Sequence, residues 1–221
     1  MEEADLNTST ALVRVGKYVF LVVSLWTLWC VAMVLWPAVF AQAVLRALAR
    51  VSIVLLPALV FYFNQHNKQS LKDYFLLREN GLYGVFIGAG VVLLYFGLRW
   101  WGNYPAIYSA FKLPKGFALW LNFIVGSPLA EELFFRGIVF KELQKMMRVS
   151  KAAILSALAF GAIHVPQWML LDDLYGIELM SVFGSIFIYG VIFAFLVYFT
   201  KSLWAALLPH WINNFILLAI A

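Results

Sequence analysis

Apolar segments long enough to cross a lipid bilayer recur along the whole chain. Hydropathy predicts seven of them, at residues 18–37, 47–63, 82–98, 117–140, 152–165, 178–199 and 203–219. Because hydrocarbon offers no partner to backbone N–H and C=O groups, such a segment must satisfy them internally, as a helix does. The composition agrees: 64% of the residues are hydrophobic and 12% are charged, against about 25% charged in a typical soluble domain. We therefore predict an all-α, polytopic membrane helix bundle.

About seven transmembrane helices are predicted, and the second span leaves the count open between six and eight. Arg46 and Arg50 fall where that span would begin, and could instead mark a helix lying in the membrane interface. Residues 1–17, before the first span, form a polar N-terminal leader.

Basic residues in the loops predict the orientation of the chain. With the N-terminus inside, ten Lys and Arg residues fall in inside loops and five in outside loops. The inside set is Arg14, Lys17, Lys68, Lys72, Arg78, Lys141, Lys145, Arg148, Lys151 and Lys201, and the outside set is Arg46, Arg50, Arg99, Lys112 and Lys115. This bias favours a cytoplasmic N-terminus and explains the net charge of +5 without any nucleic-acid partner.

Charged side chains inside the fourth apolar run are the first candidates for chemistry. Glu131, Glu132 and Arg136 lie there, downstream of Ser127 and Pro128. A charge at the bilayer centre costs roughly 2.5–3.5 kcal/mol on the insertion scale, so each needs a partner, water or a function. Glu132 and Arg136 are four residues apart and are predicted to form an ion pair. Glu131 has no such partner on its helix, which makes it a candidate general base.

Polar residues in two later spans can share a pocket with Glu131. His164 follows Phe160 by four residues, and His210 precedes Asn214 by four, so each pair shares a helix face. Three helices would then enclose one polar pocket able to hold a water molecule. Trp168, like other tryptophans near span ends, is predicted to anchor its helix at headgroup level.

These residues form three motifs, EExxxR at Glu131 to Arg136, FxxxH at Phe160 to His164 and HxxxN at His210 to Asn214. Their order and separation resemble those of the CPBP family (CAAX protease and bacteriocin-processing, or Abi, type II CAAX prenyl endopeptidase-like), a family of intramembrane glutamic endopeptidases. The resemblance covers about residues 115–221, a predicted catalytic transmembrane core. Residues 18–114 are then N-terminal transmembrane helices.

The resemblance implies roles for single residues. Glu131 and His164 would activate water, and His210 and Asn214 would stabilise the oxyanion, without a metal. Glu132, Arg136 and Phe160 would support them. It also implies a membrane-associated protein or peptide substrate, either unmodified or prenylated or otherwise lipidated, and location in the bacterial inner membrane.

Two alternatives remain open from the sequence. Glu131, His164 and His210 could instead bind zinc, with water as the fourth ligand, whereas the single cysteine, Cys30, excludes a multi-cysteine site. The chain could also be a non-catalytic membrane protein, either a transporter that uses Glu131 as a proton relay or an immunity-type binding partner.

Overall fold

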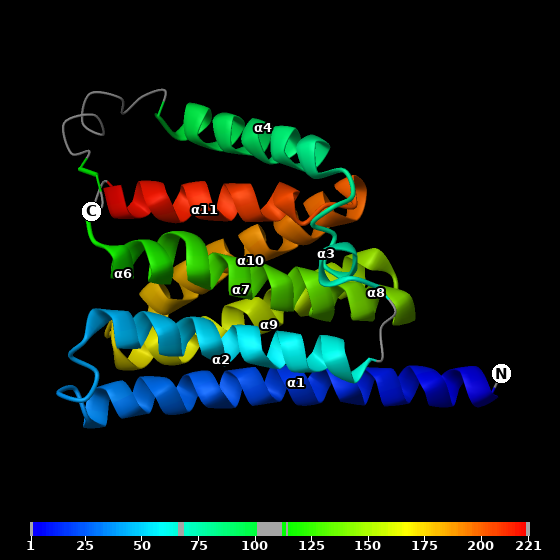
Figure 1. Ribbon diagram of the computed structural model, residues 1–221, viewed down its shortest axis with the longest axis horizontal. Coiled ribbons are helices and arrows are strands. Elements are labelled where there is room, and N and C mark those ends of the chain that lie inside the picture. The colour runs from blue at the N-terminus through cyan, green and yellow to red at the C-terminus, as the bar shows by residue number, and fades with distance from the viewer. Residues whose placement is uncertain (1, 66–68, 101–111, 114, 220–221) are drawn as a thin grey trace.

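The computed structural model describes residues 2–65, 69–100, 112–113 and 115–219. All regular secondary structure in these residues is helical, which confirms the predicted fold class. Figure 1 shows long helices running alternately back and forth, with the two ends of the chain at opposite ends of the bundle. The six long single helices are α1 (Glu2–Leu35), α2 (Ala43–Asn64), α4 (Gly81–Trp100), α9 (Val149–Leu170), α10 (Gly176–Thr200) and α11 (Trp204–Ala219).

A seventh rod is built from five consecutive helical elements, and we call it the central rod. It consists of α6 (Phe117–Leu119), the π-helix η1 (Trp120–Gly126), α7 (Ser127–Phe134), a second π-helix η2 (Phe135–Phe140) and α8 (Lys141–Met146). A short helix, α3 (Leu71–Tyr74), lies near the start of α4.

Each of the seven predicted spans coincides with one of these rods. Helix α2 continues unbroken through Arg46 and Arg50, so the start of the second span is no separate interfacial helix. By length and composition four helical segments can cross a membrane: Thr10–Leu35, Ala43–Asn64, Val149–Leu170 and Gly176–Thr200. A further apolar helix, Gly81–Tyr95, is shorter. Helix α11, with 16 residues, is only about 24 Å long.

The central rod is enclosed by the other helices. Helix α2 packs against α7 and η1, α9 packs against η2, and α11 packs against η1 and α7. Figure 1 shows α2 and α11 on either side of the rod. All six residues of η2 are buried, and Phe135 and Phe140 in η2 are completely so, as is Phe134 at the end of α7. Glu131, Glu132 and Arg136 are buried as well, so these charges lie inside protein and not against lipid.

Close contact between α4 and α11 fixes the helix that carries His210. A Cβ atom added to Gly88 would lie 3.0 Å from Cδ of Pro209, and one added to Gly84 would lie 2.5 Å from Oγ of Ser202. Small residues allow such an approach between membrane helices.

Candidate active site

The two π-helices bracket the turn that carries both glutamates. At the end of η1, the N–H of Ser127 bonds to the carbonyl of Asn122, five residues back. In the same register the next carbonyl, that of Phe123, would accept from residue 128, but Pro128 has no N–H. The Phe123 carbonyl is thereby left without a helical donor. Single π-turns of this kind occur often at functional sites.

Asn214 on α11 supplies the donor that Pro128 lacks. Its Nδ2 atom lies 2.8 Å from the carbonyl oxygen of Phe123 and donates to it. Asn213 donates to the Oδ1 atom of Asn214 at 3.3 Å. These two contacts fix the orientation of the Asn214 amide and leave its second N–H available.

The predicted ion pair between Glu132 and Arg136 is present. Nη1 of Arg136 lies 3.2 Å from Oε1 of Glu132, and both side chains are almost fully buried. The guanidinium also lies over the ring of Phe160, 4.3 Å from its centroid, and Nη2 donates to the Gly190 carbonyl at 3.4 Å. Arg136 thus balances the Glu132 charge and contacts both α9 and α10.

Glu132 has a second partner that the sequence did not predict. Its Oε1 atom lies 2.8 Å from Nδ1 of His210, and this contact is buried. Because an ionised carboxylate can only accept, the proton on Nδ1 of His210 is donated to it. The other ring nitrogen, Nε2, is thereby turned toward Glu131.

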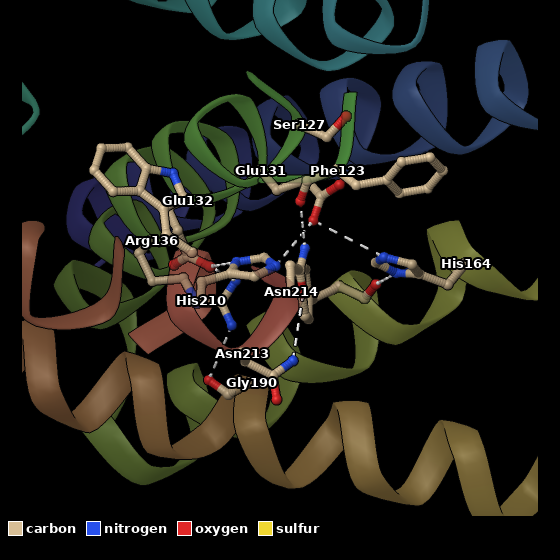
Figure 2. Close-up of polar contacts among 12 residues, drawn as sticks. Phe123, Ser127, Glu131, Glu132, Arg136, His164, Gly190, His210, Asn213 and Asn214 are labelled. Atoms are coloured by element: carbon tan, nitrogen blue, oxygen red, sulfur yellow. Dashed lines mark hydrogen bonds and ion pairs between the residues drawn. The ribbon is translucent and has the colours of Figure 1, made fainter. Parts of the chain in front are cut away.

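Glu131 lies between two histidines (Figure 2). Its Oε2 atom is 3.7 Å from Nε2 of His210 and 3.9 Å from Nε2 of His164, and its side chain is 3% exposed. Nδ1 of His164 donates to the Phe160 carbonyl at 2.8 Å, so Nε2 is also the nitrogen that this ring presents. Both distances are too long for a direct hydrogen bond and suit a bridging water molecule.

A cavity of about 290 Å³ contains this arrangement. Glu131, His164, His210 and Asn214 all line it, as does Phe160. At about 30 Å³ per water molecule, it has room for several waters or for part of a peptide. The structure therefore brings together around one cavity the four residues predicted to be catalytic.

A comparison with known protein families shows which family this part of the chain resembles. Residues 113–216, just under half of the sequence, match the family described as type II CAAX prenyl endopeptidase Rce1-like. This segment is similar to that family, and we call it the Rce1-like domain. The result confirms the resemblance to the CPBP and CAAX protease family and supports an intramembrane endopeptidase in general. No curated protein and no solved structure matched the chain.

The Rce1-like domain includes every residue predicted for the site, from Glu131 to Asn214. Helices α1 and α2 lie outside it, although α2 contributes Arg50 to the cavity. The partition of the chain at residues 17 and 114 stays a prediction.

The prediction that Trp168 anchors its helix at headgroup level is wrong. It is only 7% exposed and stacks on His164, with ring centroids 5.4 Å apart and planes 25° apart. The Phe160 ring meets His164 from another direction, edge-on at 5.0 Å. Trp168 is therefore a wall of the cavity and not a headgroup anchor. Its position four residues after His164, on the same helix face, was the available signal.

The zinc alternative requires three ligand side chains close together. Among the residues that the structure describes, no group of three His, Cys, Asp or Glu side chains is arranged to hold a metal ion. Zinc would need the oxygen and both Nε2 atoms about 2.0–2.2 Å from one point. Glu131, His164 and His210 would have to draw together around it.

Proposed function

We propose that this chain is an intramembrane glutamic endopeptidase, which hydrolyses a peptide bond of a membrane-associated protein or peptide without a metal. The proposal depends on one observation. The buried Glu131 carboxylate faces the Nε2 atoms of His210 and His164 at 3.7 and 3.9 Å, inside a cavity of about 290 Å³. A carboxylate and an imidazole that share one water can together remove its proton.

In the first step, a water molecule bound between Glu131 and His164 gives a proton to the Glu131 carboxylate. At the same time, the oxygen of this water attacks the carbonyl carbon of the substrate's peptide bond. A C–O bond forms, and the carbonyl electrons move to the oxygen, which becomes an oxyanion. His164 accepts a hydrogen bond from the water through Nε2, because its Nδ1 proton is held by the Phe160 carbonyl. The neighbouring rings of Phe160 and Trp168 keep this imidazole in place.

The oxyanion is stabilised by His210 and Asn214. The free N–H of the Asn214 amide donates to it, since the other one is held by Phe123. His210 donates through Nε2 in its imidazolium form, because Nδ1–H is already directed to Glu132. Donors fixed in a buried site need no reorganisation as the charge develops.

In the second step, the tetrahedral intermediate collapses and the C–N bond breaks. The proton on Glu131 passes to the leaving nitrogen, so that the products are a carboxylic acid and an amine. Glu131 returns to its ionised form. Glu132, Arg136 and Phe160 take no part in proton transfer and hold His210 and α9 in position.

The substrate class follows from the family description, which names a prenyl endopeptidase. We propose that the substrate of the present chain is also membrane-associated, and that it is prenylated or otherwise lipidated. Substrates trapped by cross-linking to an inactive Glu131→Gln variant, and identified by mass spectrometry, would test this directly.

The central test is Glu131→Gln, which keeps the size of the side chain and removes its basicity. Cleavage of captured substrate should fall about 100-fold or more, while the thermal unfolding midpoint stays close to that of the wild type. Glu178→Gln, at an exposed position on α10, is the matched control and should retain activity. Substantial turnover by Glu131→Gln would refute the mechanism.

A further inference from the structure

Arg50 carries a buried charge that forms no ion pair with any carboxylate of the described residues. It lies in α2, outside the Rce1-like domain, and is 7% exposed. Its guanidinium carbon lies 5.0 Å from the centroid of the Trp26 ring and 4.8 Å from that of Phe123. Among the described residues, no carboxylate lies within 4.0 Å of it, and its Nε atom has no hydrogen-bond partner.

Arg50 lies where two cavities meet. One is the catalytic cavity, and the other, of about 310 Å³, is lined by residues from α1, α2, α6, η1 and α9 together with Asp172. Arg50, Phe123 and Gln167 line both. In Figure 1 these elements meet at the end of the bundle opposite the N-terminus. A chain segment entering from that end would pass Arg50 on its way to Glu131.

The other charged side chains beside this passage make polar contacts of their own. Arg46 donates through Nη1 to the backbone carbonyls of Phe40 and Ala41, at 2.5 and 3.2 Å. Asp172 accepts from Gln167 at 3.3 Å. Glu131 is directed to its two histidines. Arg50 is thus a cation of this passage for which no hydrogen bond or ion pair is found among the described residues.

We propose that Arg50 binds a carboxylate of the peptide substrate and positions the peptide at the junction of the two cavities. The proposal rests on the proposed peptidase function. The planar guanidinium matches a carboxylate with two parallel hydrogen bonds, and stacking between two rings holds it ready. The carboxylate belongs either to the C-terminus of the peptide or to an Asp or Glu side chain.

Binding of synthetic probes separates these sources and does not require catalysis. The probes are an N-dodecanoyl tri-alanine with a free C-terminal carboxylate, its C-terminal amide, and an amide in which the last alanine is glutamate. Affinities would be measured by thermal shift on the full chain in detergent. The wild type should bind a carboxylate probe about tenfold more tightly than the tri-alanine amide. Preference for the first probe indicates a terminal carboxylate, and preference for the third indicates a side chain.

Arg50→Gln should lose this discrimination, and Arg50→Lys should retain part of it. Arg14→Gln on α1 is the matched control, because that exposed guanidinium donates to Gln65 and lines neither cavity, and it should discriminate as the wild type does. Equal affinity for all probes, absence of binding by the wild type, or discrimination that persists in Arg50→Gln would overturn the proposal. Repeating the measurement in Glu131→Gln distinguishes it from the proposed function, because carboxylate binding survives there even though cleavage is lost.

Discussion

Nδ1 of His210 lies 2.8 Å from Oε1 of Glu132, although 78 positions separate the two residues in the sequence. The same oxygen atom lies 3.2 Å from Nη1 of Arg136. Glu132 therefore connects the ion pair within the central rod to the histidine that faces Glu131. The two adjacent glutamates therefore differ in their surroundings: Glu132 contacts Arg136 and His210, whereas Glu131 lines the cavity.

Glu132→Gln should destabilise the protein much more than Glu131→Gln does. Removing the negative charge leaves the buried guanidinium of Arg136 uncompensated, which typically costs about 3–5 kcal/mol. The thermal unfolding midpoint in detergent and the yield of folded protein measure this effect. A Glu132→Gln variant as stable as the wild type would show that the ion pair is dispensable.

Pro128→Ala should lower activity without unfolding the protein. Alanine restores an N–H that, in the π-register, competes with Asn214 for the Phe123 carbonyl, so the Asn214 amide loses its fixed orientation. We expect a rate loss of about tenfold, or about 1.4 kcal/mol. Asn214→Ala, which removes the donor itself, should lose about 100- to 1,000-fold. Unchanged cleavage by both variants would exclude Asn214 as an oxyanion donor.

Gly126→Ala should disrupt η1. A Cβ atom at this position would overlap the backbone carbonyl of Leu121 and lie 2.9 Å from Cγ2 of Val51 on α2. Such overpacking typically costs about 1–3 kcal/mol and should also displace Phe123. Gly90→Ala on α4 meets nothing within 4 Å and serves as the control. Both unfolding midpoint and cleavage rate should fall for Gly126→Ala alone.

Removal of metal should leave cleavage intact. We expect purified active protein to contain far less than one zinc ion per chain and to tolerate a strong chelator. The zinc alternative, with Glu131, His164 and His210 as ligands, predicts the opposite result. Loss of activity with a chelator, restored by added zinc, would replace the metal-free mechanism.

Labelling of engineered cysteines should reveal the orientation in the membrane. Lys145 on α8 and Asp173 after α9 are exposed at opposite ends of the bundle, and the native Cys30 is buried. With a cytoplasmic N-terminus, a membrane-impermeant maleimide should label Asp173→Cys but not Lys145→Cys in intact cells. The reverse labelling pattern would show that the orientation predicted from the loop charges is wrong.

Local patterns made part of this structure predictable. Apolar runs located the helices, and the four-residue spacing of Glu132 and Arg136 was enough to predict their ion pair, because both residues lie on one helix. The shared helix faces of Phe160 with His164 and of His210 with Asn214 likewise indicated which side chains could meet Glu131.

The remainder depends on contacts between distant segments. Nothing in the local sequence pairs Glu132 with His210, or Asn214 with the Phe123 carbonyl, because each contact joins separate helices. The two π-helices have no periodicity signal, although Pro128 indicates a missing donor. Arg50 was visible as a charge in an apolar run, but only the packing of α2 on the central rod places it at the cavity.

Glu131 enters the membrane during synthesis before either of its histidine partners. Glu132 and Arg136 can neutralise each other as soon as their helix inserts, but His164 and His210 lie on α9 and α11, which are made later. The nascent central rod therefore carries one carboxyl group that must stay protonated or remain in contact with water until those helices arrive. Biogenesis of this protein thus depends on holding this charged segment in a hydrated or protein-lined environment until the bundle closes around it.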